Sequence, residues 1–155
     1  MFHIVDDEEN IRTFLAEVLG LMGYEAETFG CSSDYLEYAK SDDFNLPYAL
    51  LSDVQMPKMN GYEMLDQVRQ IHPAIRAAII SGFSEHAGEA KSTPCIILPK
   101  PIVMEEFEQV IQSFVSCYEN GPNAEINGCG APENHEVFGH EAWSCPLGKR
   151  CESCW

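Results

Sequence analysis

Short apolar runs alternate with helical patterns of apolar residues through about three quarters of the 155-residue chain. Five runs have the length and composition of β-strands, and they cover residues 2–6, 25–29, 48–53, 77–81 and 95–99. Three of them are apolar at nearly every position, which is typical of strands that are covered on both faces in a parallel sheet. The pattern therefore predicts a buried, five-stranded parallel sheet.

Apolar residues between these runs recur every three or four positions, which indicates amphipathic helices. The clearest stripe consists of Ile11, Phe14, Leu15, Val18, Leu19 and Met22. A second stripe consists of Phe107, Val110, Ile111, Phe114, Val115 and Tyr118. We interpret both stripes as core. Weaker patterns predict helices over 33–40 and 61–71, whereas residues 83–93 have little apolar periodicity, so any helix there is expected to be short.

Strand and helix patterns that alternate in this way predict an open, doubly wound α/β sheet with right-handed crossovers. On such sheets, ligands bind outside the carboxyl ends of the strands. Polar residues follow several predicted strands at that edge, and these are Asp6, Asp7, Asp53, Ser81 and Lys100. We therefore expect three carboxylates, one hydroxyl and one ammonium to converge on a small site.

Three neighbouring carboxylates need a compensating cation to remain ionised. Hard oxygen ligands favour Mg²⁺, which commonly combines one or two carboxylates with a phosphate oxygen. A carboxylate can also attack phosphorus and form an acyl phosphate, while a metal ion, Lys100 and Ser81 hold the phosphoryl oxygens. The cluster therefore predicts a Mg²⁺ site with room for a phosphoryl group.

The ordered set of polar residues resembles the receiver domain of two-component response regulators. The resemblance rests on Asp6-Asp7, Asp53 followed by "MPKMNG", Ser81, and Lys100-Pro101, and it covers residues 1–118. It implies a flavodoxin-like fold with strand order 2-1-3-4-5.

The resemblance also implies a role for each acid. Asp53 would accept a phosphoryl group from the phosphohistidine of a sensor histidine kinase or a phosphotransfer protein. Asp7 would bind Mg²⁺ directly, Asp6 would bind it through water, and the main-chain carbonyl of Gln55 would complete the protein ligands.

Two further residues at this edge would respond to the phosphoryl group. Lys100 would pair with the acyl phosphate, and Ser81 would move inward to bond it. The Lys100-Pro101 bond resembles one that is cis in this family. The chain departs from the family pattern at Ile97, where many receivers have Tyr or Phe, so a coupled switch of Ser81 with an aromatic residue is not expected.

Composition and charge narrow the function classes. The net charge is −16, which disfavours binding to the phosphate backbone of nucleic acids. We identify no signal peptide and no apolar run long enough to cross a membrane, so a cytoplasmic location with reduced cysteines is expected.

Residues 119–155 form a Gly-, Asn- and Pro-rich linker followed by a Cys-rich extension. Candidate metal ligands there are Cys129, Cys145, Cys151 and Cys154, with His135 and His140 as substitutes. Four thiolates suit either a tetrahedral Zn²⁺ site or an Fe–S cluster. The cysteines could instead be idle in a disordered tail, or Cys151 and Cys154 could form a thiol redox pair.

We therefore expect a free-standing phosphoacceptor that acts through contact with a downstream protein and has no separate enzymatic output. One alternative is an Asp-nucleophile phosphatase or phosphotransferase. Such enzymes usually have an acid two residues after the nucleophile, whereas this chain has Gln55, which cannot serve as a general acid. The other alternative is a thiol or metal sensor that uses the receiver as a scaffold.

Overall fold

A single parallel sheet is the centre of the computed structural model, which describes residues 1–82 and 94–120. Its strands are β1 (Phe2–Val5), β2 (Ala26–Phe29), β3 (Leu50–Asp53), β4 (Ala77–Ser81) and β5 (Ile96–Pro99). They are arranged in the order β2-β1-β3-β4-β5, and every adjacent pair is parallel. All five predicted strands and the predicted strand order are confirmed.

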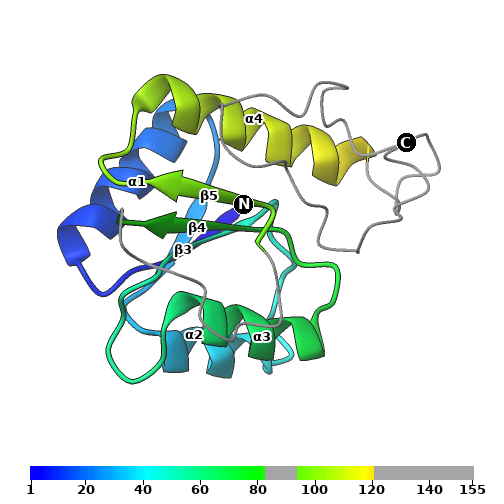
Figure 1. The fold of residues 1–155 in the computed structure, drawn as a ribbon. Coiled ribbons are helices and arrows are strands. Elements are labelled where there is room, and N and C mark those ends of the chain that lie inside the picture. Colours follow the sequence, from blue (N-terminus) through cyan, green and yellow to red (C-terminus); the bar gives the residue numbers. More distant parts are fainter. Residues whose placement is uncertain (83–93, 121–155) are drawn as a thin grey trace.

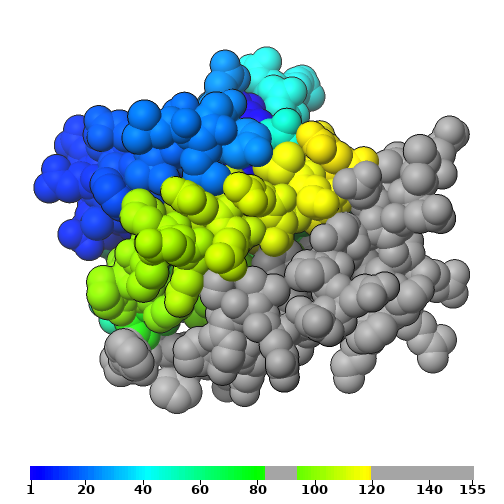
Figure 2. All heavy atoms as spheres, turned by 90° about the horizontal axis from the view of Figure 1, so that it is seen from above, coloured from blue at the N-terminus to red at the C-terminus, as the bar shows by residue number. Residues whose placement is uncertain are grey.

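Helices cover both faces of this sheet (Figure 1). They are α1 (Glu9–Leu21), α2 (Ser32–Ala39), α3 (Gly61–Ile71) and α4 (Met104–Asn120). Helices α1 and α4 lie on one face, where Figure 2 shows them from above, and α2 and α3 lie on the other. Residues 83–93 and 121–155, where a short helix and a Cys-rich extension are expected, lie outside the described residues. No helix in the described ranges has the length and hydropathy needed to cross a bilayer.

The central strands are apolar on both sides because each side contacts a different helical layer. Ile4 and Leu51 belong to the core beneath α1 and α4, whereas their neighbours Val5 and Leu50 belong to the core beneath α2 and α3. Successive residues of a strand point to opposite faces of the sheet. This explains why the strands appear in the sequence as nearly continuous apolar runs.

Helix α1 buries a narrower face than its apolar stripe predicts. Leu15 and Leu19 are fully buried against the sheet, but Phe14 is 45% exposed and Leu21 is 90% exposed. Phe14 precedes Leu15 by one residue, which places it about 100° away around the helix. The interpretation of Phe14 as a core residue is therefore wrong.

A buried histidine lies in strand β1, in the core on the α2 side. His3 is fully buried, and its Nδ1 lies 3.1 Å from the hydroxyl oxygen of Tyr35. Its ring makes edge-on contacts with four aromatic side chains, Phe29, Tyr35, Tyr38 and Phe44. Nε2 has no hydrogen-bond partner, and Glu27 Oε2 is 3.9 Å away. Burial, with a smaller contribution from the N-terminal amine, lowers the pKa of His3 to about 4.

This low pKa predicts a loss of stability in mild acid. The unfolded chain binds a proton at His3 below its ordinary pKa of 6.5, whereas the folded chain does so only below about 4. The free energy of unfolding should therefore be complete above pH 6.5 and fall as the pH drops to 4, by roughly 3 kcal/mol from this residue. The free energy of unfolding, measured with urea at several pH values, should fall more steeply between pH 6.5 and 4 for the wild-type chain than for His3→Gln. Equal slopes in the two proteins would contradict this assignment.

Candidate functional site

Two buried carboxylates share one ammonium group at the carboxyl ends of the strands. Asp53 is the last residue of β3, Asp6 directly follows β1, and Lys100 directly follows β5. Lys100 Nζ forms an ion pair with Asp53 Oδ1 and lies 4.0 Å from Asp6 Oδ2. Both carboxylates are buried, whereas Lys100 is partly exposed. Parallel strands therefore bring together residues that lie almost 100 positions apart in the sequence.

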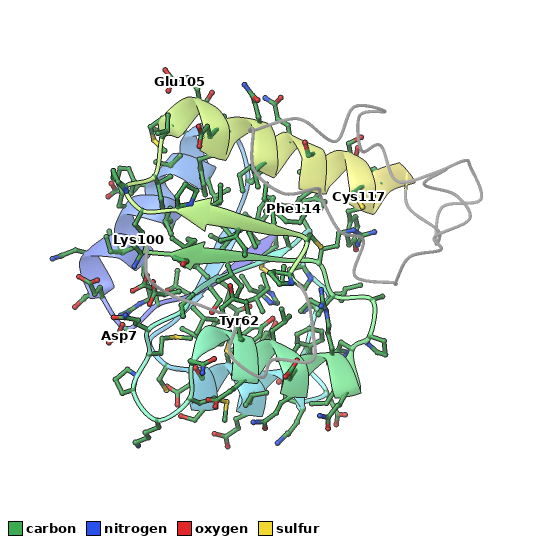
Figure 3. The ribbon with its side chains drawn as sticks, in the orientation of Figure 1. Asp7, Tyr62, Lys100, Glu105, Phe114 and Cys117 are labelled. Carbon is green, nitrogen blue, oxygen red and sulfur yellow. The ribbon has the colours of Figure 1, made fainter. Side chains whose placement is uncertain are left out.

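The third acid at this edge is placed differently. Asp7 is exposed, although Figure 3 shows it at the same end of the sheet as Lys100. No three His, Cys, Asp or Glu side chains within 1–82 and 94–120 are grouped closely enough to hold a metal ion. Of the three predicted carboxylates, Asp6 and Asp53 are buried beside Lys100, whereas Asp7 is exposed and contributes to the raised pKa of Asp6. Gln55, whose carbonyl was the other predicted ligand, is exposed in the loop that follows β3.

Asp6 is held in a position that disfavours its charge. The main-chain N–H of Glu8 donates to Asp6 Oδ1 at 2.8 Å, but Oδ2 is buried without a hydrogen-bond partner. Burial is the largest cause of the raised pKa of Asp6, and the nearby Asp53 carboxylate raises it further. Burial also tends to lower the pKa of Lys100, yet the Asp53 and Asp6 carboxylates outweigh it and the net pKa is raised. Lys100 is therefore protonated, and Asp6 Oδ2 has this ammonium 4.0 Å away but no hydrogen-bond donor.

These groups fit Mg²⁺ by their chemistry. Asp6 has a buried carboxylate oxygen without a hydrogen-bond partner, and the Asp53 carboxylate is close enough to raise the pKa of Asp6. Hard anionic oxygens of this kind are the ligands that Mg²⁺ prefers. A divalent cation here would compensate the negative charge that one ammonium leaves over. The residues available to hold it are Asp6, Asp7, Asp53 and the carbonyl of Gln55.

Ser81 and the segment after β5 complete the edge. Ser81 is buried; its hydroxyl donates to the carbonyl of Gly82 at 2.9 Å, and its own carbonyl accepts from the main-chain N–H of Lys100 at 2.8 Å. The Lys100-Pro101 bond is cis, as the sequence resemblance implies. Ile97 is 50% exposed on β5, so the position of the usual aromatic residue has an aliphatic side chain that is half in solvent.

Gly61 allows helix α3 to begin against the end of β3. A Cβ at Gly61 would lie 2.1 Å from the main-chain carbonyl oxygen of Asp53 and 2.9 Å from Ser52 Oγ. Asn60 then starts the helix with a capping box, in which the N–H of Glu63 donates to Asn60 Oδ1 at 2.9 Å and the N–H of Asn60 donates to Glu63 Oε2 at 3.1 Å. From the sequence alone, Gly61 is an ordinary turn glycine, and its close contact with the acid's backbone is visible only in the fold.

The candidate ligands of the Cys-rich extension, Cys129, His135, His140, Cys145, Cys151 and Cys154, lie outside the described residues. Cys117 near the end of α4 is described and buried. Arg76 Nε donates to its sulfur at 3.0 Å, Arg76 Nη2 donates to its carbonyl at 2.9 Å, and the guanidinium lies 5.4 Å from the ring centre of Tyr118. Cys117 is therefore packed where the buried Arg76 holds the last turns of α4, an interaction that sequence reasoning missed.

Known proteins resemble this chain in sequence and in fold. Residues 2–112 match the family described as response regulator receiver domain. The DNA-binding transcriptional regulator NtrC of Escherichia coli K12 is 30% identical over 148 residues, which cover 87% of this chain and 31% of NtrC. The sensor histidine kinase RcsC of the same strain is 27% identical over 120 residues, or 74% of this chain and 12% of RcsC. The chain thus spans about a third, or less, of the length of these relatives.

A solved structure shows the same arrangement of elements. The solution structure of the apo receiver domain of NtrC superimposes with a TM-score of 0.65 at 29% sequence identity. The match covers 77% of this chain and 96% of that domain.

The close approach of Gly61 to Asp53 predicts that Gly61→Ala destabilises the protein. The added methyl group would force the backbone of β3 or α3 to move, at a cost of roughly 1–3 kcal/mol. Gly20→Ala in α1 is a matched control, because no atom lies within 4 Å of its added Cβ. This control should leave the stability unchanged or raise it slightly, because Gly20 is an exposed residue in the last turn of α1. Urea unfolding measures both changes, and equal effects of the two substitutions would refute the proposed contact.

Proposed function

The chain belongs to the response regulator receiver domain family, and from that premise we propose that it is a phosphoacceptor whose acceptor residue is Asp53. The observation that supports this most strongly is the position of the Asp53 carboxylate, which lies at the end of a buried strand with the Lys100 ammonium bound to it. A carboxylate beside a fixed cation suits attack on phosphorus, because negative charge on the incoming phosphoryl oxygens is compensated in place.

The proposed reaction is a transfer between two nucleophiles. One oxygen of the Asp53 carboxylate attacks the phosphorus of a phosphohistidine, a P–O bond forms, and the P–N bond breaks. The imidazole of the donor leaves with the bonding electron pair. Lys100 shifts its ion pair from the carboxylate toward the acyl phosphate, and the Ser81 hydroxyl, which now donates to Gly82, can turn to a phosphoryl oxygen.

Mg²⁺ bound beside these groups would neutralise phosphoryl oxygens and orient them for attack. The protein's part is to supply hard oxygen ligands. We propose that Asp7, Asp53 and the carbonyl of Gln55 bind the ion directly and that Asp6 binds it through water. The buried Oδ2 of Asp6, which has no hydrogen-bond partner, supports this choice. Asp7 is exposed at the same edge, so its carboxylate can reach an ion there without a change in packing.

A sensor histidine kinase or a phosphotransfer protein is the proposed donor, and a downstream protein is the proposed receiver of the signal. Acceptor function is favoured over a phosphatase because Gln55, two residues after Asp53, has an amide that cannot protonate a leaving group. The Zn²⁺ or Fe–S site in the extension stays a prediction from the cysteine spacing.

Incubation of the chain with acetyl phosphate and Mg²⁺ should add one phosphoryl group, seen by intact mass spectrometry. The increment should be absent in Asp53→Asn, because an amide oxygen is a poor nucleophile and cannot form the acyl phosphate. Asp34→Asn is the matched control, since Asp34 is exposed on α2, and it should be phosphorylated like the wild type.

Two outcomes would overturn the assignment. One is a phosphoryl increment of equal size in Asp53→Asn and in the wild type. The other is rapid turnover of phosphomonoesters by the wild type, which would indicate a phosphatase.

A further inference from the structure

Arg12 reaches back from α1 to the main chain of Asp6. Its Nη1 donates to the Asp6 carbonyl oxygen at 2.6 Å. Two other bonds hold the same residue, since the Asp6 N–H donates to the Phe29 carbonyl at 3.2 Å and the Glu8 N–H donates to Asp6 Oδ1 at 2.8 Å. Oδ2 is the one Asp6 oxygen that is buried without a hydrogen-bond partner. The backbone bonds thus leave that oxygen available to the site.

The carbonyl that Arg12 binds belongs to the peptide group that joins Asp6 to Asp7. A peptide group is planar, so the direction of the Asp6 carbonyl also determines the direction of the Asp7 N–H and the position of the Asp7 Cα. Asp7 is exposed and lacks the packing that fixes Asp6. The hydrogen bond from Arg12 therefore restricts the position of the Asp7 Cα, from which the carboxylate side chain extends.

Gly30, after β2, leaves space for the guanidinium group. A Cβ at Gly30 would lie 3.5 Å from Arg12 Nη1 and 3.6 Å from both Cζ and Nη2. An alanine methyl would just contact the guanidinium group, and a larger branched side chain would displace it. Gly30 does not have a positive φ, so alanine is expected to be tolerated there, whereas a branched side chain would extend into the guanidinium group.

We propose that Arg12 is a positioning residue for the cation site, which acts through the Asp6–Asp7 peptide group and holds Asp7 where it can bind Mg²⁺. This inference rests on the proposed function, because it assigns a further residue to the same site. Groups that orient metal ligands commonly change metal affinity by about 10- to 100-fold when they are removed.

A purely electrostatic role for Arg12 predicts the opposite sign. A guanidinium group near a cation site repels the cation, so its removal alone would strengthen Mg²⁺ binding. If Arg12 positions Asp7, its removal weakens Mg²⁺ binding despite the loss of a positive charge. The direction of the change therefore separates the two roles.

The test is isothermal titration calorimetry of the full chain with Mg²⁺. Arg12→Ala should weaken binding by about tenfold or more. Arg12→Lys, which can still donate to the Asp6 carbonyl, should restore most of the affinity. Lys40→Ala, which removes an exposed cation at the C-terminal end of α2, is the matched control and should leave the affinity unchanged.

Gly30→Val supplies a second perturbation that keeps the charge of Arg12 but displaces its guanidinium group. It should weaken Mg²⁺ binding in the same direction as Arg12→Ala, and thermal unfolding without Mg²⁺ checks that both variants are folded. The inference is overturned if Arg12→Ala or Gly30→Val binds Mg²⁺ as tightly as the wild type, or more tightly. Its failure alone would leave wild-type phosphorylation at Asp53 intact, whereas a wild type that takes up neither Mg²⁺ nor phosphate would overturn the proposed function as well.

Discussion

Two buried carboxylates that share one ammonium group are the constraint on which the rest of the site depends. Burying Asp6 and Asp53 at the sheet edge is unfavourable unless positive charge accompanies them. Lys100 supplies one such charge, in contact with Asp53 and 4.0 Å from Asp6. The remaining negative charge would attract a cation to this edge. Phosphoryl oxygens could then replace other ligands of that cation. The same excess of negative charge that raises the pKa of Asp6 thus supports the proposed chemistry.

The fold sets this cluster through several contacts away from the reacting atoms. Gly61 lets α3 start directly against the carbonyl of Asp53, and the N–H of Lys100 donates to the carbonyl of Ser81 at the end of β4. On the other side of the site, Arg12 spans from α1 to the end of β1. Each of these contacts fixes backbone rather than a charged side chain. The position of the carboxylates therefore depends on backbone contacts from several elements around the sheet edge.

The sequence is sufficient for the sheet and for the placement of Asp6, Asp53, Ser81 and Lys100, because strand periodicity and the carboxyl-edge rule depend only on local patterns. The strand order came from the resemblance to receiver domains, since no local pattern specifies which strands are neighbours. The sequence does not show how much of an apolar stripe is buried, so the prediction for Phe14 was wrong. The exposures of two adjacent helix positions can be told apart only when the elements that pack against the helix are known. The sequence also could not show the roles of Arg12, Gly61 and Arg76. Their contacts join residues from different elements, and no spacing rule connects them.

The central claim is that one cation site is formed at this edge by acids from different strands. A crystal structure of the chain grown with Mg²⁺ tests it most directly. We predict an ion bound directly by Asp7, Asp53 and the carbonyl of Gln55, with Asp6 bound to it through water and Lys100 still beside Asp53. An ion bound elsewhere, or Asp6 and Asp53 turned apart with Lys100 in solvent, would contradict the account.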